Sequence, residues 1–247
     1  MFDLLTILAI FGVFLLAGTI KGVVGMGLPT TAIGLMTIVT DPRTAIAITL
    51  LPMLTSNAWQ VYRSKKTVET LVRYRLFGIV LLVTITLTLL ASKNAAQELL
   101  LLILGFTLLL FVTVSATKWA PRIPQSQDQA AQAIGGTVAG VLGGLTAVWA
   151  PPMAVYLTAR NVGKDEFVRA TGLLILVGTI PLCIGYLGQS HLTWGLFLLS
   201  CVALPSTFIG FSIGEKIRGI VSEQAFRTTL LVFFAVMALN LMRRALF

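Results

Sequence analysis

Long apolar runs, separated by short polar connections, fill most of this 247-residue chain. In order, the runs cover residues 4–20, 28–40, 44–62, 76–92, 98–116, 132–147, 151–159, 167–187, 193–213 and 226–242. A helix of roughly 20 apolar residues crosses a bilayer, and most of these runs approach that length. The pattern therefore predicts an all-α polytopic membrane protein.

The runs fall into two halves around the long polar stretch at residues 117–130. Each half has a glycine-interrupted pair of short runs followed by three longer ones, so we predict a first membrane repeat at 1–116, a cytoplasmic linker at 117–130 and a second membrane repeat at 131–247. A shift of 122 residues supports the repeat, because it places three residues of the first interruption on equivalents in the second: Gly18 on Gly140, Gly22 on Gly144 and Pro29 on Pro151.

The positions of the basic residues explain the net charge of +9. They lie in short loops without interleaved aromatic residues, so we expect membrane lipids as neighbours and no nucleic-acid partner. The loop at 63–75 holds five of them and is predicted to be cytoplasmic. If each interrupted pair is a re-entrant hairpin, 13 of the 18 lysines and arginines lie on that side.

The hairpin model also fixes how the halves are related. One hairpin and three spans cross the membrane an odd number of times, which predicts that the second repeat is inverted relative to the first. Inverted repeats with broken helices are a common plan among transporters. The alternative model treats each short run as a full span, and it gives about ten helices.

The first interruption places a lysine at the predicted depth of the membrane, within Gly18-Thr-Ile-Lys21-Gly22-Val-Val-Gly25-Met-Gly27-Leu-Pro29. Glycine and proline weaken a helix, and irregular backbone inside a membrane must be buried in protein or line a wet cavity. A charge at this depth is costly and indicates a functional site.

An ammonium near the N-terminal ends of half-helices would attract a small anion, and the glycines would let that anion approach the backbone. Two other roles for Lys21 stay open at this point. Its side chain can reach an interface, or it can pair with Asp3 or Asp41.

The second interruption, at residues 143–152, carries no charge. Trp149, within this interruption, either lines the anion cavity or fills a gap in the packing. Polar residues after each interruption either complete the site or bond between helices, and Gly-x3-Gly at 18–22 and 140–144 can equally be a helix-packing face. The candidate substrate-binding residues are Lys21, Gly22, Gly25, Gly27, Pro29, Thr49, Ser56, Asn57, Gln60, Gly144, Trp149, Pro151 and Thr171.

The residues that most enzymes need are missing from the apolar runs. The only histidine, His191, falls in a short loop, so we expect no catalysis, no metal site and no cofactor. No carboxylate lies clearly inside a span, so no Asp or Glu side chain is available there to relay protons. Coupling through Lys21, through a proton on the substrate, or through no ion at all stays open.

With both interruptions in view, the chain resembles the sulfite exporter TauE/SafE family of membrane permeases, of the 4-toluene sulfonate uptake permease type. The resemblance rests on three motifs: Lys21-Gly-Val-Val-Gly-Met-Gly-Leu-Pro29, Pro42-Arg-Thr-Ala-Ile-Ala-Ile-Thr-Leu-Leu-Pro52 and Gly143-Gly-Leu-Thr-Ala-Val-Trp-Ala-Pro-Pro152. The third departs from the family, which usually has glycines where Ala147, Trp149 and Ala150 stand.

The resemblance implies a multi-pass transporter of the bacterial inner membrane for sulfur-containing anions such as sulfite or organosulfonates. We predict alternating access between the two repeats, with the anion held near Lys21. An anion channel, or a permease for another small carboxylate or inorganic anion, is the alternative. The particular anion, the direction of transport and the oligomeric state are left open.

Overall fold

The protein is described by a computed structural model over residues 4–117, 122–218 and 223–246. The first half contains α1 (Leu4–Val24), α2 (Leu28–Met36), α3 (Pro42–Tyr62), α4 (Thr67–Arg73), α5 (Arg75–Ala91) and α6 (Gln97–Thr117). After the 3-10 turn η1 (Gln125–Gln127), the second half contains α7 (Asp128–Thr146), α8 (Ala150–Ala159), α9 (Lys164–Gly188), α10 (Trp194–Ile217) and α11 (Glu223–Leu246). The prediction of an all-helical protein is confirmed over these ranges. Of the predicted linker, residues 118–121 lie outside them.

Within the described residues, three helices are long and apolar enough to cross a membrane: α1, α9 and α10. The pair α4 and α5 passes the same test together, with a bend of 73° between the two helices. The helices are therefore those of a multi-pass membrane protein, as the apolar runs predicted.

Local sequence explains where several helices begin. Asp41 caps α3, since its side chain accepts a hydrogen bond of 3.0 Å from the Thr44 backbone N–H, and Pro42 follows at the first helical position. Thr193 caps α10 in the same way, by accepting from the Leu196 backbone N–H at 3.4 Å. These caps place the starts of both helices at polar connections between apolar runs.

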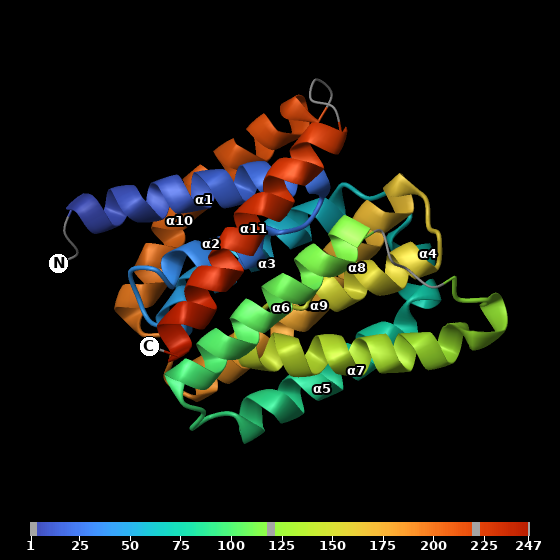
Figure 1. Cartoon of the computed structure of the whole chain (residues 1–247), viewed down its shortest axis with the longest axis horizontal. Helices are drawn as coiled ribbons and strands as arrows, with labels where there is room; N and C mark the ends of the chain where they lie inside the picture. The colour runs from blue at the N-terminus through green and yellow to red at the C-terminus, as the bar shows by residue number, and fades with distance from the viewer. Residues whose placement is uncertain (1–3, 118–121, 219–222, 247) are drawn as a thin grey trace.

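The two interrupted segments fold back on themselves (Figure 1). The pair α1 and α2 starts and finishes at the end of the molecule where both chain termini lie, and there Arg244 of α11 donates to the Thr37 carbonyl just after α2. The pair α7 and α8 starts and finishes at the other end, where Tyr156 of α8 donates to Asp128 at the start of α7. Each interrupted pair is thus a hairpin in space.

Helices in the two halves correspond under the shift of 122 residues. The starts of α2 and α3 move onto the starts of α8 and α9, and the end of α1 moves onto the end of α7. The packing corresponds too, because α1 lies against α10 while its counterpart α7 lies against α5, the counterpart of α10. This is the order and packing that an internal repeat would produce, and the repeat itself stays a prediction.

Glycines bring α1 and α10 into backbone contact. A methyl group on Gly22 would lie 2.3 Å from the Phe211 carbonyl oxygen, and one on Gly214 would lie 2.1 Å from the Thr19 carbonyl oxygen. Gly144 of α7 packs similarly, with 2.6 Å from such a methyl group to Cβ of Thr88 in α5. The Gly-x3-Gly segments at 18–22 and 140–144 are therefore helix-packing faces.

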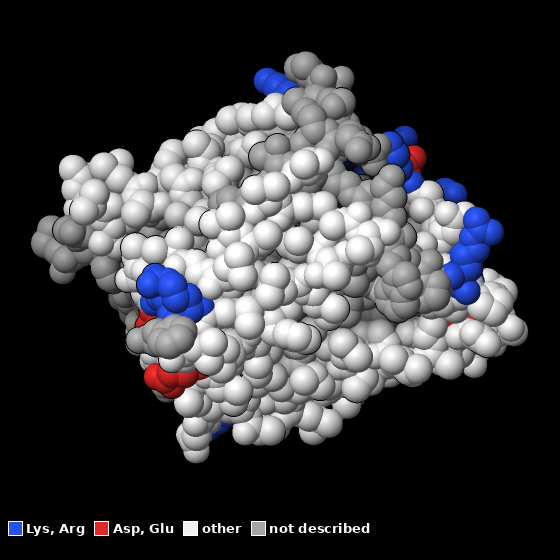
Figure 2. All heavy atoms as spheres, viewed as in Figure 1, with Lys and Arg blue, Asp and Glu red and all other residues white. Residues whose placement is uncertain are grey.

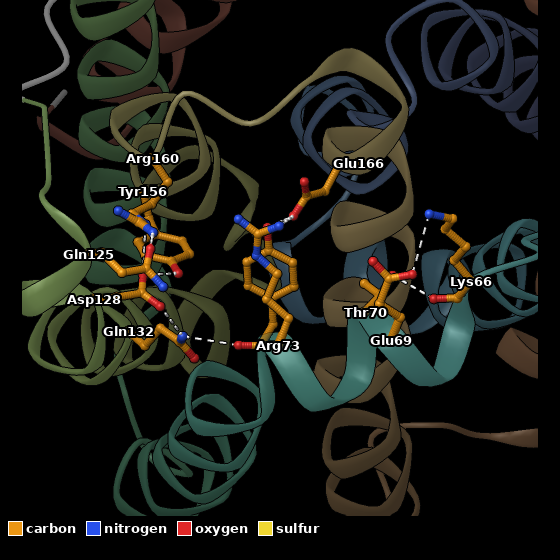
Figure 3. Close-up of polar contacts among 11 residues, drawn as sticks. Lys66, Glu69, Thr70, Arg73, Gln125, Asp128, Gln132, Tyr156, Arg160 and Glu166 are labelled. Atoms are coloured by element: carbon orange, nitrogen blue, oxygen red, sulfur yellow. Dashed lines mark hydrogen bonds and ion pairs between the residues drawn. The ribbon is translucent and has the colours of Figure 1, made fainter.

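Charged side chains gather toward the two ends of the molecule, and the face between them is largely uncharged (Figure 2). The end formed by α4, the start of α7 and the end of α8 carries a network of polar contacts (Figure 3). Arg160 Nε lies 2.8 Å from Asp128 Oδ1, and Gln132 donates to the other carboxylate oxygen of Asp128 at 2.9 Å. Arg73 of α4 pairs with Glu166 of α9 at 2.7 Å. This network fastens the open end of the α7–α8 hairpin to its neighbours.

Replacing Arg160 by methionine should lower the free energy of unfolding by about 3 kcal/mol, because it leaves the Asp128 carboxylate largely buried without its cation. The two side chains are only 9% and 18% exposed. Lys66→Met is the matched control, since the separate Lys66–Glu69 pair at the same end of the molecule is 58% and 67% exposed (Figure 3). Thermal unfolding in detergent should show a lower Tm for Arg160→Met and almost none of that loss for Lys66→Met. Equal losses would contradict the role given to the buried pair.

Candidate functional site

Lys21 lies in the last turn of α1 and its side chain is completely buried. Its Nζ atom donates a hydrogen bond of 2.5 Å to Oδ1 of Asn57 in α3. The Asn57 amide nitrogen in turn donates to the Met53 carbonyl oxygen at 2.7 Å, which fixes the orientation of the side chain. Two candidates separated by 36 positions in the sequence are therefore in direct contact.

No carboxylate in the described part of the chain pairs with Lys21. Asp41, one of the two partners considered from the sequence, caps α3 instead, and Asp3 lies outside the described residues. An ammonium offers three donors, and Asn57 accepts one of them. Burying a cation without a counter-charge is costly. An ammonium in this position has hydrogen-bond donors left over, and a bound anion would offset the cost of burying its charge.

The first break needs its glycines for backbone geometry. Gly25 and Gly27 have φ angles of 86° and 103°, in the left-handed region that side chains disfavour. Gln60 of α3 bridges the break to α9, because its amide nitrogen donates to the Gly25 carbonyl at 3.3 Å and to the Val168 carbonyl at 2.7 Å. The break is thereby held at a fixed place between α3 and α9.

The second break repeats only the first of these two left-handed positions, and it does so without glycine; Trp149, at the place of Gly27, has a φ angle of −119°. Ala147 has a φ angle of 57° at the end of α7, and Trp149 stands at the N-terminal cap of α8. The indole ring of Trp149 is 1% exposed and lies against two glycines, Gly143 of α7 and Gly178 of α9. This contact accounts for a large side chain at a position where the first break has Gly27.

A small pocket of about 20 Å³ lies between the two breaks, and Lys21 is not among the residues that line it. The first turn of α2 lines it through Gly27 and Thr30, and the first turn of α8 lines it through Ala150 and Pro151. Neither helix start is capped by a side-chain hydrogen bond. Uncapped helix N-termini carry partial positive charge and favour anions. The remaining lining residues are apolar: Ile20, Val24, Met26, Phe111 and Phe234.

Of the candidate residues, Gly27 and Pro151 line this pocket, and the others, Lys21, Asn57 and Trp149 included, do not. The hydroxyl groups of Thr49, Ser56 and Thr171 donate to carbonyl groups of their own helices, at 2.7, 3.5 and 3.0 Å. Gly22 and Gly144 face α10 and α5, so the close approach that they allow is between helices. Pro29 is buried in the first turn of α2.

The sequence reasoning did not name several residues of the pocket. Thr30 follows Pro29 directly, and its place in the first turn after the break was a usable signal. Phe111 of α6 and Phe234 of α11 meet edge-on with ring centroids 5.6 Å apart. These two phenylalanines lie within unbroken apolar runs, where nothing in the local sequence distinguishes them from their neighbours.

Comparison with known proteins identifies the family. No curated protein and no solved structure matches the chain. The model of one protein family, described as sulfite exporter TauE/SafE, matches residues 10–241. This match includes both breaks and all of the residues that line the pocket, and it confirms the resemblance read from the motifs. The chain is therefore a member of the sulfite exporter TauE/SafE family of membrane permeases.

Proposed function

We propose that the protein is a secondary transporter of small sulfur-containing anions such as sulfite or organosulfonates. Membership of a family of exporter-type permeases supports transport rather than catalysis. The observation that carries the anion site is Lys21, a fully buried cation that hydrogen-bonds Asn57 and has no carboxylate partner in the described residues. Apart from Lys21, which does not line the pocket between the breaks, the uncapped starts of α2 and α8 supply positive potential at that pocket.

The mechanism that we propose is alternating access between two inverted repeats. The matching order of helices in the halves favours it, as do the two hairpins that start from opposite ends of the molecule. A site at the meeting point of two broken helices is the arrangement that such repeats provide. Because Lys21 is completely buried, this mechanism requires the helices around it to move apart before an anion can reach the ammonium.

The transport test is counterflow of labelled sulfite in proteoliposomes. Vesicles loaded with unlabelled sulfite are diluted into a trace of ³⁵S-sulfite, and uptake is followed with time. A carrier should accumulate label transiently above equilibrium, with a rate that saturates as sulfite rises. Label that only equilibrates, at a rate proportional to concentration, would favour the channel. Vesicles that behave like protein-free ones with both sulfite and methanesulfonate would refute the proposal.

The choice of anion can be tested separately by thermal stabilisation of the purified protein. A ligand at 100 times its Kd stabilises the protein that binds it by about 2.7 kcal/mol. We expect sulfite and methanesulfonate to raise Tm, and acetate to have little effect at the same ionic strength. A response to acetate or phosphate alone would support the alternative permease, for another small carboxylate or inorganic anion.

A further inference from the structure

The two halves differ at the place where the first half holds its lysine. Under the shift of 122 residues, Lys21 corresponds to Gly143 and Ser56 corresponds to Gly178. The Trp149 indole covers both of these glycines. A methyl group on Gly143 would lie 2.9 Å from its Cε3 atom, and one on Gly178 would lie 2.8 Å from its Cζ2 atom. The indole therefore occupies the second half's counterpart of the space that the Lys21 side chain fills in the first half.

The Trp149 indole also carries a hydrogen-bond donor without an acceptor. Its Nε1 atom is buried and has no partner in the described structure. Nε1 is bonded to Cε2, the ring atom that would lie 2.9 Å from a methyl group on Gly178. The next residue, Thr179, corresponds to Asn57, and its hydroxyl donates to the Ile175 carbonyl at 2.7 Å. A buried N–H that is left unpaired is costly, so it points to an acceptor that binds from outside the chain.

We infer that the Trp149 indole N–H is a second donor to the transported anion, supplied by the second half and complementary to the Lys21 ammonium. The inference rests on the proposed function and deepens it. Trp149 immediately precedes Ala150 and Pro151, which line the pocket between the breaks. Lysine and indole together supply one positive charge and one neutral donor. That pair fits a monovalent oxyanion with at least two acceptor oxygens, such as a sulfonate.

The test uses methanesulfonate as the probe and Trp149→Phe as the variant. Phenylalanine keeps an aromatic ring over the two glycines but has no N–H group. We expect the Kd for methanesulfonate to rise about 10- to 100-fold, the range for a lost hydrogen bond to a charged group. Trp194→Phe is the matched control, because Trp194 is 73% exposed, and its Kd should equal that of the unsubstituted protein.

A direct readout does not depend on how Trp149→Phe folds. A variant in which Trp59, Trp119 and Trp194 are all phenylalanine keeps Trp149 as its single tryptophan. Its one indole N–H resonance, observed by ¹⁵N NMR, should move downfield when methanesulfonate binds, as expected for a new hydrogen bond to an anion. A resonance that stays in place at saturating methanesulfonate would overturn the inference.

The outcomes separate this inference from the proposed function. If Trp149→Phe binds methanesulfonate normally while Lys21→Met does not, the indole donor is wrong and the anion site near Lys21 stands. If both variants bind as tightly as the unsubstituted protein, the whole site is wrong, and the proposed function loses its main support.

Discussion

Replacing Lys21 by methionine should abolish anion binding while leaving Tm unchanged or higher. The ammonium is fully buried, has Asn57 as its acceptor and has no carboxylate partner among the described residues. Methionine fills a similar volume without requiring a charge to leave water, so the folded protein gains or loses little. Binding loses the buried cation of the proposed site, and we expect the Kd for methanesulfonate to rise more than about 100-fold. Calorimetric titration and thermal unfolding of the same sample measure both quantities.

Variants at Asn57 provide the control for this prediction. Asn57→Leu removes the acceptor and leaves the ammonium of Lys21 buried alone, so it should lower Tm clearly. The double variant Lys21→Met with Asn57→Leu should recover most of that loss, because residues in direct contact do not behave additively. A large drop in Tm for Lys21→Met alone would show that the lysine is structural.

Adding a methyl group to the α1–α10 contact should be among the most destabilising single changes in the protein. In Gly22→Ala and Gly214→Ala the new Cβ would lie 2.3 and 2.1 Å from backbone carbonyl oxygens. Backbone cannot rotate away as a side chain can, so the two helices must separate. We expect each change to lower the free energy of unfolding by about 3 kcal/mol, at the upper end of overpacking effects. Thermal unfolding followed by size-exclusion chromatography measures the loss.

Gly12→Ala is the matched control within the same helix, because a methyl group there meets nothing within 4 Å. It should leave Tm unchanged or slightly raised, since alanine favours a helix more than glycine does. If Gly22→Ala were as stable as Gly12→Ala, the close packing of α1 on α10 would be incorrect.

The sequence was most informative where local backbone chemistry decides the structure. Glycines and prolines predicted both breaks, and α1 ends at Val24 while α2 begins at Leu28. The second break was placed equally well, between Thr146 and Ala150. Positive φ angles and missing N–H groups act over a few residues, so their effect can be read without knowledge of the rest of the fold.

The contacts between helices could not be predicted in the same way. The bond between Lys21 and Asn57 depends on the rotation of α1 and α3 about their axes. In a soluble protein an apolar stripe shows which face of a helix is buried. Here lipid and protein interior have similar polarity, so the apolar runs carry no such stripe. The same reason hid Phe111 and Phe234 as pocket residues.

Backbone contact between α1 and α10 also limits how the protein can change shape. Carbonyl oxygens lie against glycines on both helices, so no side chains are available there to repack in a second arrangement. The counterpart contact differs, because Gly140 and Gly144 of α7 lie against the side chains of Thr84 and Thr88 in α5. Only α1 and α10 are therefore expected to move as one rigid block. Helices can then move relative to one another only where side chains join them, as Gln60 joins α3 to α9. Since Lys21 belongs to α1, it can move only together with α10.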